Sequence, residues 1–171
     1  MKKIFKIFYK IKKNPYLIFL YGFAAIILAG TILLTLPMAS NDNKSVGFIN
    51  ALFTATSAVC VTGLTVVNTA SHWTVFGKVV IILLIQIGGL GVMTMTALIA
   101  FFIGKKISLN TRLLIMEERN VDELQGVVRL TKNILLYTFG VELAGAILFS
   151  FVFIKDFGLG KGIAYSIFHA I

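Results

Sequence analysis

A long uncharged segment near the N-terminus constrains this chain more than any other feature. Residues 16–36 form a mostly apolar run of 21 residues between Pro15 and Pro37. At 1.5 Å of rise per residue, a helix of that length reaches about 30 Å, which is enough to cross the hydrocarbon core of a bilayer. Because the apolar part of a cleaved signal peptide is only about 7 to 15 residues long, we interpret the run as a membrane span.

Two further apolar runs predict two more spans. One covers residues 79–103, and the other covers residues 135–154 and contains one acid, Glu142. Hydrophobic residues make up 58% of the 171 positions and charged residues only 13%, whereas soluble domains carry about 25% charged residues. The sequence therefore predicts an all-α membrane protein.

The placement of positive charge predicts how the spans are oriented. Six lysines precede the first run and six Lys or Arg residues lie within 105–132, whereas residues 37–77 contain only Lys44. Cytoplasmic loops carry the excess of Lys and Arg, so the N-terminus and the central segment are expected in the cytoplasm of a multi-pass protein. The basic residues gather beside apolar spans and are not spread over a folded surface, which argues against nucleic-acid binding despite the net charge of +9.

The external stretch between the first two spans contains more than a connector. Residues 46–59, VGFINALFTATSAV, are apolar but too few to cross, and they lead into CVTGLT at residues 60–65. Non-helical backbone at membrane depth is tolerated where it is buried in protein or lines a wet cavity. A short helix followed by a glycine-containing turn is typical of a selectivity filter, whose backbone carbonyls replace the ion's water. A plain surface turn at Val-Thr-Gly is the alternative.

An internal repeat favours the filter interpretation. Residues 47–56 align without gaps on residues 162–171, with a glycine, a phenylalanine and an alanine identical. Both segments follow an outward-going span, so a unit of span, pore helix, filter and span restarts and stops before its second filter. The expected divisions are a basic cytoplasmic N-terminus at 1–15, the first repeat at 16–103, a cytoplasmic connector at 104–132 and the start of a second repeat at 133–171.

ALFTATSAVCVTGLTVVNTASHW followed by GKVVIILLIQIGGLGVMTMTALIA resembles the first repeat of the Trk/Ktr/HKT potassium transporters, most of all the membrane subunit of bacterial Ktr systems. In that family, four span–pore helix–span repeats surround one pore, and each filter strand has a characteristic glycine. The resemblance implies that Gly63 is this glycine. It also implies that carbonyls of Val61, Thr62 and Gly63, with Cys60 and Leu64 as further candidates, coordinate potassium.

The resemblance also implies the protein's setting. It implies potassium uptake across the plasma membrane by a homodimer of complete subunits, gated by a cytosolic ring of nucleotide-binding regulatory subunits. Potassium would be the transported ion, and no bound cofactor is expected. The resemblance leaves two alternatives open. Sodium is either a coupling or an activating ion, and transport is either channel-like or symport. The alternative function is a membrane scaffold or accessory subunit in which the turn at Gly63 is structural.

Other residues in the spans and loops have less specific interpretations. Glu142 could form a structural bond to a neighbouring pore element or line the ion pathway, because acids inside a span are often functional. Gln86 could pair across helices or touch the pore, and the glycines at 88, 89 and 91 predict close packing or a kink. Trp73 is typical of an interfacial anchor and His72 of a solvated loop. No catalytic constellation is present in the sequence, so we predict that the protein is not an enzyme.

Overall fold

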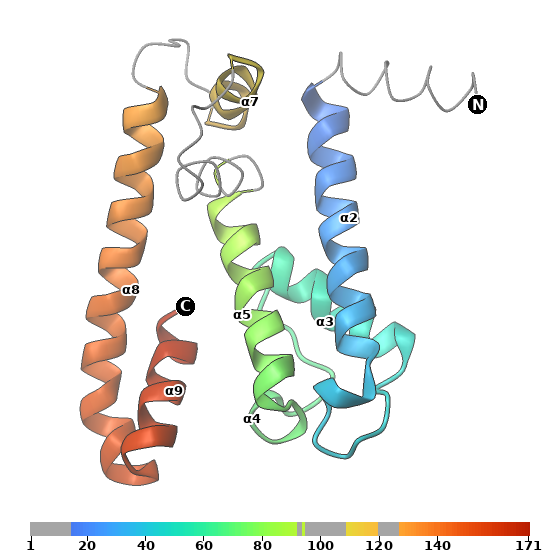
Figure 1. Cartoon of the computed structure of the whole chain (residues 1–171), viewed down its shortest axis with the longest axis vertical. Coiled ribbons are helices and arrows are strands. Elements are labelled where there is room, and N and C mark those ends of the chain that lie inside the picture. The colour runs from blue at the N-terminus through green and yellow to red at the C-terminus, as the bar shows by residue number, and fades with distance from the viewer. Residues whose placement is uncertain (1–14, 92–93, 95–108, 120–126) are drawn as a thin grey trace. The chain divides into compact units, whose positions relative to one another are not determined.

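The structure is a computed structural model that describes residues 15–91, 94, 109–119 and 127–171. Three predicted segments lie wholly or partly outside these residues. They are the basic N-terminus up to residue 14, the part of the second span beyond residue 91 (except residue 94), and much of the 104–132 connector. The described residues are helical and contain no strand apart from an isolated antiparallel bridge between Ser40 and Trp73. The chain divides into two units, residues 1–124 and 125–171 (Figure 1).

The first unit is built around three apolar helices. Its described elements, in chain order, are α2 (Pro15–Thr35), η1 (Pro37–Ala39), α3 (Phe48–Val59), α4 (Thr69–His72), α5 (Val75–Leu90) and α7 (Leu109–Arg119). Figure 1 shows α2 and α5 running beside each other, with the short helix α3 packed against both. The predicted apolar segment at 46–59 is therefore a separate helix held by the helices before and after it.

Small residues allow the three helices to approach closely. A β-carbon added at Gly30 of α2 would lie 2.7 Å from the Cδ1 atom of Leu84 on α5, so glycine makes room for that leucine. Ala51 and Ala55 of α3 are completely buried. The core of this unit thus depends on small side chains at helix contacts, which is typical of helix packing in membranes.

Helix α5 differs from the predicted second span at both ends. It begins at Val75, where the Thr74 hydroxyl caps it by accepting a hydrogen bond from the Gly77 N–H at 3.2 Å. It ends at Leu90, because Gly91 adopts a φ of 85° while its N–H bonds to the Ile87 carbonyl. Gly91 therefore ends α5 within the run 79–103 that was predicted as the second span, and the rest of that run, apart from residue 94, lies outside the described residues.

The second unit consists of α8 (Val127–Phe157) and α9 (Leu159–Ala170). Figure 1 shows α9 turning back alongside α8, and Gly158, with a φ of 77°, forms the turn. A β-carbon on Gly162 would lie 2.6 Å from the Ile154 Cα atom, so this turn also requires glycine at that position. Among the described residues one helix, over Val128–Phe157, is both long and apolar enough to cross a membrane, while Phe19–Thr35, Phe48–Val59 and Val75–Leu90 are shorter apolar helices.

The two short helices begin in the same way. Gly47 precedes α3 with a φ of 87°, and Gly158 precedes α9 with a φ of 77°. The sequence alignment instead paired Gly47 with Gly162, one helical turn further along the chain. A shift of one turn preserves the helix face, which explains why Ala51 and Ala55 on α3, like Gly162 and Ser166 on α9, are buried.

Candidate ion-binding loop

The loop at residues 60–64 begins where α3 ends. The Cys60 N–H still bonds to the Thr56 carbonyl at 2.8 Å, and the Val61 N–H bonds to the Ala58 carbonyl at 3.2 Å. All five residues of the 60–64 loop are exposed within this chain. Because the C-terminal end of a helix carries the negative end of its dipole, α3 favours a cation in the region that this loop occupies.

Two residues of the loop have backbone angles that are unusual for the chain. Val61 has a φ of 53° and Gly63 a φ of 73°, whereas Thr62 between them is not in the positive-φ region. A positive φ is a genuine outlier for a β-branched residue such as valine. Such strain persists only where surrounding structure imposes it, and it clusters at functional sites. The strain at Val61 therefore marks the loop as a candidate site.

Gly63 is selected by conformation and not by lack of space. A β-carbon built on it would meet no atom within 4 Å, but its φ lies in the left-handed region that side chains disfavour. Any substitution at this position therefore strains the backbone without a steric clash.

The side chain of Ser57, on the last turn of α3, is hydrogen-bonded to two residues of the loop. Its hydroxyl donates to the Leu64 carbonyl at 2.7 Å, and the Thr62 hydroxyl lies 3.0 Å from it. The Thr62 N–H also bonds to the Ser57 carbonyl at 3.0 Å. Of the predicted coordinating carbonyls, that of Leu64 thus already accepts a hydrogen bond within the chain. Sequence reasoning missed Ser57, because a serine in a short apolar helix gives no local sign of its partner seven residues later.

Helix α5 supports the end of α3 through Gly88. A β-carbon at Gly88 would overlap the Val59 carbonyl oxygen and lie 2.7 Å from the Val59 carbonyl carbon. Gly88 therefore serves close packing, as the sequence predicted, whereas Gly89 has no neighbour within 4 Å of an added β-carbon. Gln86 is half-buried on the same helix.

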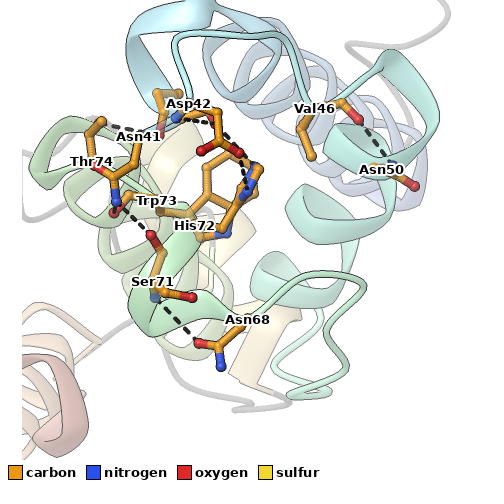
Figure 2. Close-up of polar contacts among 11 residues, drawn as sticks. Asn41, Asp42, Val46, Asn50, Asn68, Ser71, His72, Trp73 and Thr74 are labelled. Carbon is orange, nitrogen blue, oxygen red and sulfur yellow. Dashed lines mark hydrogen bonds and ion pairs between the residues drawn. The ribbon is translucent and has the colours of Figure 1, made fainter.

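A set of hydrogen bonds, which we call the loop clasp, joins residues 38–42 after α2 to residues 71–74 before α5 (Figure 2). The Asn41 N–H bonds to the His72 carbonyl at 2.9 Å, and its side-chain amide donates to the Ser71 carbonyl at 2.6 Å. The Thr74 N–H bonds to the Ala39 carbonyl at 2.9 Å. The clasp fixes the ends of the 35-residue stretch (39–73) that contains α3 and the 60–64 loop.

Two aromatic residues of the clasp differ from their predicted surroundings. Trp73 is 1% exposed and packs beside Gly77, where an added β-carbon would lie 3.0 Å from its ring, so the interfacial-anchor prediction is wrong. His72 is half-buried and not fully solvated: its Nε2 atom lies 3.3 Å from the Ser40 hydroxyl and its Nδ1 atom 4.0 Å from the Asp42 carboxylate. The His72 side chain therefore joins the two halves of the clasp, and Trp73 joins them through its backbone bridge to Ser40.

Glu142 belongs to the second unit, where it lines a mostly apolar pocket of about 340 Å³. The other lining residues are Phe139, Leu143, Ala146, Ile167, Ala170 and Ile171. They come from α8, from the end of α9 and from Ile171 after it, so the acid borders a pocket that both helices line.

Comparison with known proteins gives a consistent assignment. Residues 11–171 match the family model described as "TrkH: Cation transport protein". The chain is 48% identical over 158 residues to the potassium/sodium uptake protein NtpJ of Enterococcus hirae, covering 92% of this chain and 35% of the relative. It is 42% identical over 161 residues to the Ktr system potassium uptake protein B of Bacillus subtilis, covering 94% and 36%.

The chain thus spans about a third of the length of these relatives. A third relative is the Ktr system potassium uptake protein B of Vibrio alginolyticus, to which the chain is 38% identical. That match covers 90% of this chain and 33% of the relative. The relatives are transporters and not enzymes, and the resemblance to Trk/Ktr membrane proteins is confirmed. The chain belongs to the TrkH family of cation transport proteins.

Proposed function

We propose that the complete protein takes up potassium across the cell membrane and that the 60–64 loop is one strand of its selectivity filter. The names of the relatives, each a potassium or potassium/sodium uptake protein, support the transported ion. The all-helical build and the long apolar helix α8 support a location in the membrane.

The observation that carries the filter assignment is the alternation of backbone angles in the loop. Val61 and Gly63 have positive φ and Thr62 does not. The N–H groups of Val61 and Thr62 bond back to the carbonyls of Ala58 and Ser57 at the end of α3. Because the N–H and C=O of a planar trans peptide point in opposite directions, the carbonyls of Cys60 and Val61 are turned away from α3. Such carbonyls can replace the hydration shell of potassium. We assign coordination to the carbonyls of Val61, Thr62 and Gly63, with Cys60 at the end of α3 as a further ligand.

The same proposal assigns a membrane arrangement to the helices. In it, α2 and the segment that begins with α5 are spans, and α3 is a pore helix between them. Helices α8 and α9 are the span and pore helix of a second repeat. The glycines with positive φ that precede both α3 and α9 support this repeat. The concentration of Lys and Arg at 1–15 and 104–132 supports a multi-pass protein with a cytoplasmic N-terminus.

We further propose that the complete subunit forms a homodimer and is gated by a cytosolic ring of nucleotide-binding subunits. The word "system" in the names of the Ktr relatives supports partner components. Sodium is proposed as the coupling or activating ion, which the name of the Enterococcus relative, a potassium/sodium uptake protein, supports. A coupling sodium ion would cross the membrane with potassium in a fixed ratio, whereas an activating sodium ion would leave conduction channel-like.

Ion flux from the complete protein tests the proposal against a non-conducting scaffold. The complete subunit is reconstituted into vesicles, and potassium entry is followed while an inward potassium gradient and a negative interior potential both drive it. We expect entry well above that of protein-free vesicles, and stimulation when sodium is added. Folded, correctly inserted protein that gives only the background rate, with and without its cytosolic partner, would support the scaffold instead.

A further inference from the structure

The hydroxyl group of Ser57 makes bonds that differ from those of other hydroxyls on the short helices. Thr54, Thr56 and Ser166 each donate to the carbonyl four residues earlier on their own helix, at 2.9, 2.7 and 2.7 Å. Ser57 donates instead to the Leu64 carbonyl, seven residues later and beyond the end of the helix. The first kind of bond satisfies a hydroxyl within a helix, whereas the second joins the helix to the 60–64 loop.

The chemistry of the groups fixes the direction of this hydrogen-bond chain. A carbonyl can only accept, so the single proton of the Ser57 hydroxyl is used on Leu64. The Thr62 hydroxyl lies 3.0 Å from the Ser57 hydroxyl oxygen and 3.4 Å from the Ser57 carbonyl, and over the shorter distance it donates to the hydroxyl oxygen. The chain runs from Thr62 through Ser57 to Leu64, and successive bonds of this kind strengthen one another in a low dielectric. Ser57 is 8% exposed, so water does not compete freely for it.

This chain fixes both neighbours of Gly63. Thr62 is bonded to Ser57 through its N–H and its hydroxyl, and Leu64 through its carbonyl. Gly63 itself meets nothing within 4 Å on the side where a β-carbon would stand, so packing there does not set its conformation. The conformation of the loop at Gly63 is therefore set through its two neighbours.

We propose that Ser57 is a positioning residue that sets ion discrimination in the 60–64 loop. Its hydroxyl turns the Leu64 carbonyl toward α3 and holds Thr62, which fixes the spacing of the carbonyls of Val61, Thr62 and Gly63. The inference rests on the proposed filter function. It adds a side chain behind the filter that controls preference between potassium and sodium without touching either ion.

The test compares substitutions at Ser57 with a matched hydroxyl on the same helix. Ser57→Ala and Ser57→Cys remove or weaken the donor with little change in volume, and Ser57→Thr keeps the hydroxyl. Thr56→Val is the control, since it removes a hydroxyl that bonds only to its own helix. For each complete subunit, the half-saturating concentrations of potassium and of sodium are measured in vesicles, together with the melting temperature in detergent.

We expect Ser57→Ala to lower the preference for potassium over sodium by about three- to tenfold, the range that loss of one such hydrogen bond gives. Ser57→Cys should shift it in the same direction, and Ser57→Thr and Thr56→Val should keep the wild-type ratio. An unchanged ratio in both Ser57→Ala and Ser57→Cys, or an equal shift in Thr56→Val, would overturn the proposal, even with lower melting temperatures. If the wild-type subunit itself moves no potassium, the proposed filter function is refuted. If the wild type transports potassium and the Ser57 variants keep its ion preference, the role of Ser57 is refuted and the filter function stands.

Discussion

Gly88 on α5 lies directly against the backbone carbonyl of Val59, the residue that ends α3. No side chain separates the two helices at this point, so the last turn of α3 rests on the backbone of α5. The 60–64 loop starts at the next residue, and its position is therefore determined by this contact as well as by Ser57.

We predict that Gly88→Ala destabilises the protein. The added methyl group would overlap the Val59 carbonyl, and overpacking of this kind costs about 1–3 kcal/mol. The measurement is the melting temperature of the complete subunit in detergent. Gly89→Ala is the matched control: its added methyl group meets nothing within 4 Å, and alanine is the better helix former. Equal melting temperatures for the two variants would show that α3 and α5 are not in close contact at Gly88.

A second prediction concerns Thr74 in the loop clasp. Its hydroxyl accepts from the Gly77 N–H and donates to the Met38 carbonyl at 2.8 Å, so it caps α5 and ties that helix to η1, the turn that follows α2. Thr74→Val keeps the shape and should cost about 1–2 kcal/mol through the lost cap and hydrogen bond.

Unfolding of the complete subunit in detergent, followed by tryptophan fluorescence, measures this effect, because Trp73 is buried in the clasp. Thr69→Val on the neighbouring helix α4 provides the control for loss of a threonine hydroxyl. If Thr74→Val unfolds at the wild-type temperature, the clasp does not contribute to stability.

A third prediction separates the two roles proposed for Glu142. A carboxylate in a mostly apolar pocket needs a hydrogen-bonding partner, and glutamine retains most of that bonding capacity. We expect Glu142→Gln to keep potassium uptake, and Glu142→Leu to lower the yield of folded protein by removing a bond worth about 1–3 kcal/mol. Uptake and the amount of folded protein are measured on the same preparations. A well-folded Glu142→Gln variant without uptake would instead assign the charge to the ion pathway.

The sequence predicted the helices best where prolines or polar turns bound an apolar run. The first span was predicted at 16–36 and α2 occupies Pro15–Thr35, with Pro37 beginning the next element two residues after its end. The predicted start at residue 135 missed the first turns of α8, which begins at Val127, since Arg129 and Lys132 interrupt the apolar pattern without interrupting the helix. Hydropathy detects the part of a helix suited to lipid, and the helix itself extends further.

The predictions for the loop were limited by contacts between distant residues. Glycine and threonine in CVTGLT indicated an unusual turn, and the positive φ of Gly63 agrees with that prediction. The left-handed valine at position 61 could not be predicted, because nothing in a valine favours that conformation. The burial of Trp73 could not be predicted from the sequence, because its packing beside Gly77 and its backbone pairing with Ser40 exist only in the folded chain.

The selectivity of Gly63 variants tests the central claim most directly. Complete subunits carrying Gly63→Ala or Gly63→Ser are compared with wild type for potassium and sodium uptake in vesicles. Gly47→Ala is the matched control, because Gly47 also has a positive φ and open space around it but lies before α3 and not in the loop.

Forcing a side chain into the left-handed region costs about 1–2 kcal/mol, which the loop can relieve only by moving its carbonyls. We predict that both Gly63 variants lose about tenfold of the preference for potassium over sodium, while Gly47→Ala keeps the wild-type preference. A wild-type preference in folded, transporting Gly63 variants would contradict the assignment of this loop as the filter.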